Sequence, residues 1–239
     1  MIKDKISVIF PVYNEEFIIE KTITDYYNEF RGKIVFEMIV KEDGSTDKTK
    51  EILVKLSKKI PIKLHMSDER KGYQWSVVEA LKHAKHEWVC VVDSDYQYRP
   101  KDLWKLTPYM GTHDFILGKR IKRMDPWHRV FLSGAMNLLI RMLFGTPYRD
   151  IDAGYRLMKT KVVRRIAPRL NSLSYFTAEL VVRAHYLGYK IIEVPVSHLK
   201  RAKGTTNVFK LHKIPKIVLK EFFGILKLKS QLRKRLKGV

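Results

Sequence analysis

Two aspartates separated by one residue follow a short apolar run in the middle of the chain. The run, residues 88–92, is rich in β-branched side chains and is typical of a strand buried on both faces of a parallel sheet. Side chains at positions i and i+2 of an extended chain project to the same side, so Asp93 and Asp95 are expected to point together. Carboxylates suit a hard cation such as Mg²⁺ or Mn²⁺, so the pair predicts a metal site, although the pattern also occurs in turns and helix caps.

Two other loops are expected to leave the same edge of the sheet. Residues 11–15 (PVYNE) follow the first predicted strand, and residues 42–45 (EDGS) follow the second. Each loop alone has a structural explanation, because proline ends strands and Asp-Gly forms turns. Ligands of open α/β sheets bind beyond the carboxyl ends of the strands, where all three loops would meet. Together the loops predict one crevice that holds a base, a ribose and a metal-bound diphosphate.

Strands and helices alternate along the chain from its start. Strands are predicted at residues 6–12, 35–40, 62–66 and 88–93, with helices at 14–30, capped by Asn14, at 46–58 and at 73–85. This alternation predicts an α/β fold with a mainly parallel sheet, right-handed crossovers and flanking helices. Later helices are predicted at residues 100–109, 127–144, 161–167 and 177–187, and later strands at 115–118 and 191–196.

The charge of the chain is strongly positive and unevenly distributed. The 239 residues carry a formal net charge of +22, and residues 200–239 hold thirteen Lys and Arg against one acid, Glu221. Nucleic acid is not expected as a partner, because these basic residues lie on an amphipathic helix with an apolar face. Recognition motifs in which aromatic residues alternate with basic ones are also absent from the sequence. The single cysteine, Cys90, excludes a disulfide within the chain and favours a reducing, cytoplasmic setting.

The last part of the chain, residues 208–239, is predicted to be a basic amphipathic helical tail behind a domain of residues 1–207. Its apolar residues recur every three or four positions, with a possible break near Gly224: Val218, Phe222, Ile225, Leu228, Leu232 and Leu236. Such a helix binds an anionic membrane surface, or it packs on its own domain or on a second subunit. No uninterrupted apolar run of about 18 residues is present, so peripheral association with the membrane is expected.

Several segments in this order resemble the GT-A fold glycosyltransferases of family two, and within them the dolichol-phosphate mannose synthases and related polyprenyl-phosphate sugar transferases. The resemblance covers about residues 5–207. It rests on PVYNE at 11–15, EDGSTDKT at 42–49, Arg70-Lys71-Gly72, DSDYQ at 93–97, GKR at 118–120, Arg129 with Ser133 and Asn137, DAGYRLMK at 152–159 and EVPVSHLKRAKGTT at 193–206.

The resemblance implies a site residue for each part of the donor. Contacts to the nucleotide are implied for Pro11, Tyr13, Glu15, Glu42, Asp43 and Lys71, with Glu42 standing where an aspartate is common in the family. The divalent cation, Mg²⁺ or Mn²⁺, and the diphosphate are assigned to Asp93, Asp95 and Gln97, and Arg201 is assigned to the phosphates. Arginine suits this task because its planar fork binds phosphate oxygens bidentately.

The implied acceptor is dolichyl or polyprenyl phosphate, held by Arg120, Arg129 and Ser133, and the implied catalytic residues are Asp93, Asp95 and Arg129. Arg129 and Arg201 also have the alternative of being solvated surface charges. The implied reaction is an inverting transfer of a hexose, favouring GDP-mannose as donor, at the cytoplasmic face of the membrane. UDP-glucose or UDP-N-acetylglucosamine, and a non-lipid acceptor, stay open, as does the need for a base, for which Asp152 and Glu179 are the candidates.

Overall fold

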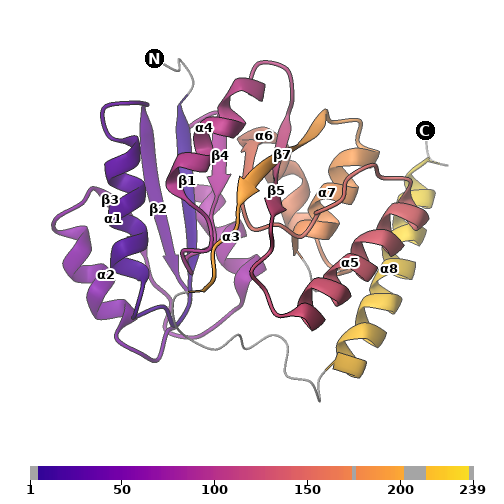
Figure 1. The fold of residues 1–239 in the computed structure, drawn as a ribbon, viewed down its shortest axis with the longest axis horizontal. Coiled ribbons are helices and arrows are strands. Elements are labelled where there is room, and N and C mark those ends of the chain that lie inside the picture. The colour runs from indigo at the N-terminus through magenta and orange to yellow at the C-terminus, as the bar shows by residue number, and fades with distance from the viewer. Residues whose placement is uncertain (1–4, 174–175, 202–213, 237–239) are drawn as a thin grey trace.

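A seven-stranded sheet forms the centre of the protein, in the order β3-β2-β1-β4-β6-β5-β7 (Figure 1). The computed structural model describes residues 5–173, 176–201 and 214–236. Every paired strand runs parallel to its neighbours except β6, which is antiparallel to both β4 and β5. The predicted mainly parallel α/β fold is therefore confirmed. The strands are β1 (Ile6–Val12), β2 (Phe36–Glu42), β3 (Ile62–His65), β4 (Trp88–Val91), β5 (Phe115–Ile121), β6 (Arg156–Lys159) and β7 (Ile191–Ser197).

Helices cover both faces of the sheet and divide the core into two clusters. Alternate residues of β1 point to opposite faces, so Ile9 belongs to one cluster and Val8 and Phe10 belong to the other. Residues of α1, α2 and α4 join the cluster of Val8, and residues of α3 and α5 to α8 join that of Ile9. The helices are α1 (Ile19–Phe30), α2 (Thr49–Ser57), α3 (Tyr73–His83), α4 (Leu103–Leu106), α5 (Trp127–Phe144), α6 (Thr160–Ile166), α7 (Phe176–Tyr186) and α8 (Ile214–Leu236).

The predicted helix boundaries are wrong in three places, one of which is the second helix, which begins at Thr49 and not at residue 46. The first helix begins at Ile19 and not at Asn14, which has a left-handed φ of 53° and cannot act as its N-cap. The segment at 100–109 is divided into the 3₁₀ turns η1 (Pro100–Asp102) and η2 (Thr107–Tyr109) with α4 between them. A proline lies within the first two positions of each turn, and its ring restricts how the helix before it can continue.

Helix α8 is unbroken at Gly224 and packs on the domain. The predicted break is wrong: Gly224 instead provides close approach, since a Cβ there would lie 2.1 Å from the carbonyl oxygen of Ser172. Ile225, Leu228 and Leu232 are buried in the same cluster as the sheet and α7, so the prediction that they meet a membrane is wrong. Phe222 is half exposed, and the side chains of Val218 and Leu236 lie outside the described residues.

The proposed domain boundary after residue 207 also lies outside the described residues. Within the described part of the chain, no helix combines the length and hydropathy that are needed to cross a membrane.

Candidate active site

The loops after β1 and β2 are joined by hydrogen bonds at the carboxyl edge of the sheet. The backbone amide of Asn14 donates to Ser45 Oγ at 3.0 Å, and the amide of Thr46 donates to Asn14 Oδ1 at 2.9 Å. The amide of Glu15 donates to Thr49 Oγ1 at 2.9 Å. The left-handed backbone of Asn14 therefore turns its side chain across to the second loop, and the two loops form one rim as predicted.

An aromatic side chain and a basic side chain stack on each other at this rim. The guanidinium of Arg70 lies over the ring of Tyr13, 4.1 Å from its centre. Pro11 is the penultimate residue of β1 and is buried beside Lys41 of β2. The ring of Tyr13 thus stacks on Arg70 at the edge of the sheet. Its contact with the nucleotide stays a prediction.

The second loop is organised by its own acidic side chains. Asp43 accepts hydrogen bonds from the backbone amides of Lys71 (2.9 Å) and Gly72 (2.7 Å), and so fixes the segment before α3. The side chain of Lys71 turns toward Trp75, 4.6 Å from the ring centre. Glu42 is fully buried and accepts from the amide of Ser45. This hydrogen bond shapes the loop, and the nucleotide contact of Glu42 stays a prediction, since its Oε2 has no hydrogen-bond partner among the described residues.

The two aspartates after β4 lie close enough to influence each other. Burial, and then the charge of Asp93, raise the pKa of Asp95 to about 6. Asp93 Oδ1 accepts a hydrogen bond from the hydroxyl of Tyr73 at 2.9 Å, and Asp95 Oδ1 accepts from the amide of Gln97 at 3.1 Å. Gln97 is itself tied to the segment after β7, since its side-chain amide donates to the Leu199 carbonyl at 3.2 Å.

This carboxylate pair fits a divalent cation. Two repelling carboxylates at a strand end are an oxygen donor set that a hard cation neutralises, with further ligands from phosphate oxygens and water. No cluster of three or more His, Cys, Asp or Glu suited to a metal occurs among residues 5–173, 176–201 and 214–236. Gln97, the third predicted ligand, lies beside Asp95, and metal binding by these three residues stays a prediction.

Arg201 lies among acidic groups of two loops. Its guanidinium forms an ion pair with Glu15 Oε1 and lies 3.8 Å from Asp95 Oδ2. Burial raises the pKa of Glu15 to about 7, against the opposing effect of Arg201. The structure therefore brings Arg201 to the diacid, and the alternative of a purely solvated charge is wrong for it. Its contact with the donor phosphates stays a prediction. The rest of the predicted loop, residues 202–206, lies outside the described part.

A second basic cluster lies at the start of α5. Arg129 pairs with Asp125 at 3.1 Å, so it is not a solvated charge either. Arg120 binds Asp150 through Nε (2.9 Å) and Nη2 (2.5 Å). Ser133 Oγ donates to Asp152 Oδ2 at 2.8 Å, which places the predicted acceptor residue beside the candidate base.

The sequence analysis missed Arg123 in this cluster. Its Nη1 donates to Ser133 Oγ at 2.7 Å, and its Nη2 lies 2.9 Å from Asp125 Oδ2. Arg123 is one of four basic residues between positions 119 and 123, and nothing in their spacing distinguishes it. Arg120 Nη2 also lies 3.3 Å from Asp152 Oδ1, and Arg123 and Arg129 share Asp125. The arginine cluster of Arg120, Arg123 and Arg129 suits an anion with several oxygens.

Glu179, the second candidate base, has a structural role. It is fully buried in α7, and it accepts from the backbone amides of Ser172 and Leu173, both at 2.8 Å. Its other oxygen accepts from Arg183 Nε at 2.8 Å. These bonds occupy the carboxylate within the core, so Glu179 is not available as a general base.

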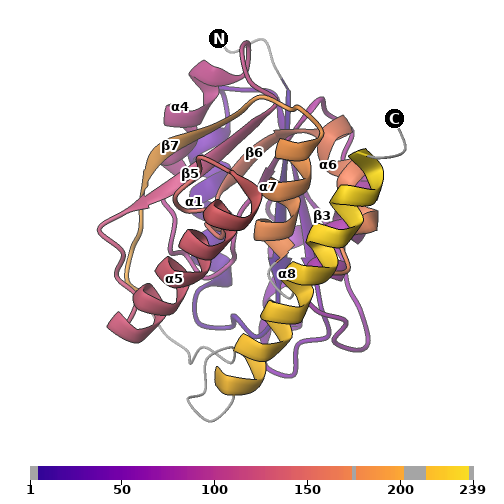
Figure 2. The ribbon, with the colours of Figure 1, turned by 90° about the vertical axis from the view of Figure 1, so that its right-hand side faces the viewer.

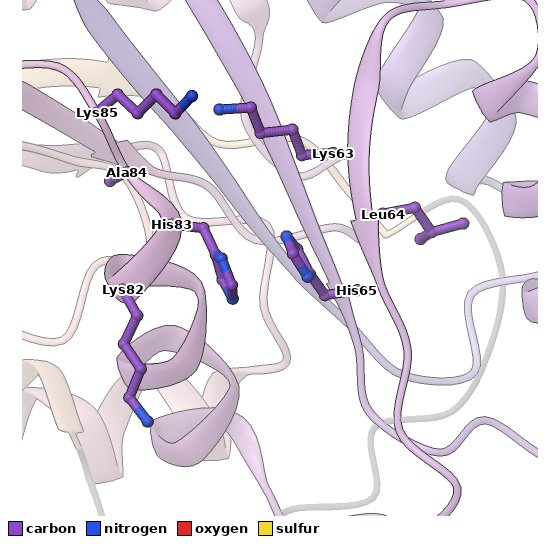
Figure 3. Close-up of a pocket in the computed structure, with 7 residues that line it drawn as sticks. All are labelled: Lys63, Leu64, His65, Lys82, His83, Ala84 and Lys85. Atoms are coloured by element: carbon purple, nitrogen blue, oxygen red, sulfur yellow. The ribbon is translucent and has the colours of Figure 1, made fainter.

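A basic cavity of about 520 Å³ lies apart from this edge (Figure 3). It is lined by β3 and the C-terminal end of α3, where the rings of His65 and His83 stack at 3.8 Å. Tyr73, which contacts Asp93, is the first residue of the same helix, and His83 is the last. Eleven residues of helix rise about 15 Å, so the cavity is distant from the diacid and contains none of the predicted site residues.

Comparison with known proteins gives a family and several relatives. The model of glycosyl transferase family 2 matches residues 7–167. A dolichol-phosphate mannosyltransferase of Pyrococcus furiosus is 28% identical over 214 residues, which are 85% of this chain and 59% of that protein. Glycosyltransferase AglD of Haloferax volcanii is 28% identical over 215 residues, 85% of this chain and 34% of that protein. The chain thus spans between a third and three fifths of the length of these relatives.

Solved structures with the same fold include glucosyl-3-phosphoglycerate synthase from Mycobacterium tuberculosis. Its complex with Mn²⁺, UDP and phosphoglyceric acid superposes with a TM-score of 0.72 at 19% identity, covering 95% of this chain and 79% of that one. Its complex with Mn²⁺, UDP-glucose and glycerol 3-phosphate gives a TM-score of 0.70 at 20% identity, covering 95% and 81%. At this level of identity the likeness establishes a common GT-A fold.

Proposed function

Because the chain belongs to glycosyl transferase family 2 and is a glycosyltransferase, we propose that it transfers a hexose, in inverting fashion, from a nucleotide sugar to dolichyl or polyprenyl phosphate. GDP-mannose is the favoured donor, since the Pyrococcus relative is named a dolichol-phosphate mannosyltransferase. UDP-glucose is the rival donor, because it is bound in the solved structure of glucosyl-3-phosphoglycerate synthase.

The two faces of α5 carry the proposal of a lipid phosphate as acceptor. Arg129 and Ser133 follow one another at four-residue spacing on one face and belong to the arginine cluster. The opposite face exposes Trp127 (80%), Phe131 (69%) and Met142 (75%) to solvent. One helix therefore presents an anion site and a large apolar surface, which suits a ligand with a phosphate head and a hydrocarbon chain.

Helix α8 adds a second exposed apolar face on the same side of the molecule. Figure 2 shows α5 and α8 in front of the rest of the domain. Among the described side chains of α8, the exposed apolar residues are Leu219, Phe222, Phe223 and Leu226, at helical spacing opposite the buried Ile225 and Leu228. The exposed cations Lys220, Lys227 and Arg233 lie on the same helix. Apolar and basic side chains together favour an anionic membrane surface. We place the protein peripherally at the cytoplasmic face on this basis.

The residues of the site must align the two reactants and neutralise the charge of the leaving diphosphate. An acceptor phosphate is already ionised near neutral pH, so its oxygen attacks the anomeric carbon as the bond to the nucleoside diphosphate breaks, and the diphosphate leaves with the electron pair. Arg120, Arg123 and Arg129 hold the attacking phosphate, and Arg201 is placed to meet the donor phosphates. Asp93 and Asp95, beside Gln97, would hold a divalent cation, which would neutralise the charge of the leaving diphosphate when bound. Asp152 then orients Ser133 and need not act as a base.

Thermal unfolding with candidate donors tests the donor assignment and the metal. GDP-mannose, UDP-glucose and UDP-N-acetylglucosamine are each added with Mn²⁺ or with EDTA, because a ligand that binds the folded state raises the midpoint. GDP-mannose with Mn²⁺ is expected to give the largest rise, and both EDTA and the variant Asp95→Asn are expected to abolish it. A larger rise with a UDP-sugar would replace the donor, and no rise with any of the three would contradict the proposed donor site.

A further inference from the structure

Asp93 is connected to a buried arginine through a tyrosine hydroxyl. Arg156 Nη2 donates to the hydroxyl of Tyr73 at 2.6 Å, and that hydroxyl lies 2.9 Å from Asp93 Oδ1. A guanidinium can only donate, so the tyrosine oxygen accepts from Arg156 and its single proton is left for Asp93. The direction of both hydrogen bonds is therefore fixed, and the hydroxyl of Tyr73 donates to Asp93 Oδ1.

Arg156 is an unusual residue to find inside this core. It lies at the start of β6, paired with Val91 at the end of β4, and it is completely buried. Its described polar partners are Tyr73, Thr177 Oγ1 at 2.5 Å and the Gly154 carbonyl at 3.5 Å, and none of these is a carboxylate. A buried charge is costly unless a buried or nearby opposite charge compensates it. The carboxylate of Asp93 is connected to Arg156 through the hydroxyl of Tyr73 and is the opposite charge near this arginine.

The other side of Asp93 is restricted by Gly154. A Cβ added to Gly154 would lie 1.7 Å from Asp93 Oδ2, so only glycine leaves room for the carboxylate there. The amide of Gly154 donates to the hydroxyl of Tyr98 at 2.8 Å, which holds the glycine in place. Asp93 is therefore confined between Gly154 and the hydroxyl of Tyr73, while Asp95 accepts from the amide of Gln97 and lies near Arg201.

Helix α7 fixes the far end of this arrangement. Its first turn provides Thr177, which accepts from Arg156. It also provides Phe176, whose ring packs edge-on against the ring of Tyr73 with the centres 6.0 Å apart. The tyrosine and the arginine are thus each held by packing and by a second partner, as residues that orient a ligand must be.

We propose that Tyr73 and Arg156 are positioning residues that hold the Asp93 carboxylate in the orientation in which it binds the divalent cation. The inference rests on the proposed use of Asp93 as a metal ligand. Removing the hydroxyl takes away the donor that holds Asp93 Oδ1 and frees the carboxylate to rotate, so the cation binds more weakly. The fold is kept, because the ring of Tyr73 supplies its packing.

Mn²⁺ binding measured by electron paramagnetic resonance, in the presence of saturating GDP or UDP, tests this directly. Tyr73→Phe should weaken Mn²⁺ binding about tenfold or more, the usual effect of losing a partner that orients a metal ligand. Thr177→Val should weaken it to a smaller extent, and Tyr189→Phe, which removes a hydroxyl bonded to Arg165, should bind like the wild type. Raising the Mn²⁺ concentration should restore the turnover of Tyr73→Phe, a rescue that a merely misfolded variant would not show.

Two outcomes separate this inference from the proposed function. If the wild type binds Mn²⁺ and Tyr73→Phe binds it equally well, the positioning role is refuted and the metal site stands. If the wild type takes up no Mn²⁺ with either nucleotide, the metal site is refuted, and the positioning role falls with it.

Discussion

Gly224 of α8 lies directly against the carbonyl oxygen of Ser172, so closely that a Cβ would be 2.1 Å from that oxygen. The same loop is held by Lys227 Nζ, which donates to the Asn171 carbonyl at 3.0 Å, and by Gln231 Nε2, which donates to Asn171 Oδ1 at 3.2 Å. Helix α8 is thus anchored to the loop before α7 by shape and by hydrogen bonds. Its basic, apolar outer face is therefore presented by a docked helix.

Gly224→Ala should destabilise the protein, because the new methyl group displaces α8 from Ser172. We expect the free energy of unfolding in urea to fall by about 2 kcal/mol, the usual scale of overpacking. Gly134→Ala on α5 is the matched control, since no atom lies within 4 Å of its added Cβ. It should stabilise by about 0.5–1 kcal/mol through helix propensity. Equal effects of the two substitutions would contradict close docking of α8.

Arg123→Gln should weaken binding of the acceptor and leave binding of the donor unaffected. Losing a hydrogen bond between charged groups costs about 1.5–3 kcal/mol, so the KM for polyprenyl phosphate should rise about tenfold or more. The KM for the nucleotide sugar should stay within a factor of two, because the hydrogen bonds of Arg123 to described residues go to Ser133 and Asp125. The exposed Arg149→Gln is the control for loss of one positive charge. An unchanged acceptor KM would remove Arg123 from the site.

Replacing one exposed phenylalanine on each of α5 and α8 should weaken membrane binding. Burying a phenylalanine contributes about 1.5–3 kcal/mol, so Phe131→Ser with Phe223→Ser should lower the affinity for anionic vesicles by more than tenfold in a sedimentation assay. Val54→Ser, on α2, removes an exposed apolar side chain elsewhere and should bind like the wild type.

The other occupant of this face would be a second copy of the chain. Analytical ultracentrifugation would then show a wild-type dimer that the double variant dissociates, while vesicle affinity stays the same. That combination would refute the membrane assignment.

His198 should make the protein labile to acid. Burial lowers the pKa of His198 from 6.5 to about 4. The unfolded chain therefore binds a proton between pH 6.5 and 4 that the folded chain does not, and stability is lost as the pH falls through this range. Relative to His198→Asn, the free energy of unfolding of the wild type should drop by roughly 3 kcal/mol at most between pH 7 and pH 4. If the free energy of unfolding in urea changed with pH in the same way for the two proteins across this range, the lowered pKa of His198 would be refuted.

The sequence predicts six of the seven strands and the position of the diacid because both depend on local patterns; it misses β6, the antiparallel strand. The run before Asp93 and the alternation of strands and helices locate the carboxyl edge of the sheet. Contacts across the fold are a different matter. Tyr73 reaches Asp93 only because α3 begins beside β4, and Arg123 reaches Ser133 only because the loop after β5 folds onto α5. Neither residue has a spacing that marks it.

Burial is the other property that local patterns leave open. Helix α8 carries two apolar faces, one with Ile225 and Leu228 and one with Phe223 and Leu226, and only the position of the domain decides which is covered. Glu42 and Glu179 have the residue type of site carboxylates, yet both are fully buried and bonded to backbone amides. For Glu179, whose two oxygens are both bonded, tertiary packing and not residue type decides its structural role.

Competition between two acceptors tests the lipid-phosphate acceptor most directly. The enzyme is incubated with Mn²⁺, the labelled nucleotide sugar that most raises its melting midpoint, anionic vesicles containing polyprenyl phosphate, and an equal concentration of soluble phosphoglyceric acid. The arginine cluster and the apolar face of α5 predict that the label moves into the organic phase as a lipid-linked sugar. Label that stays in the aqueous phase on phosphoglyceric acid, with none on the lipid, would contradict the proposed function.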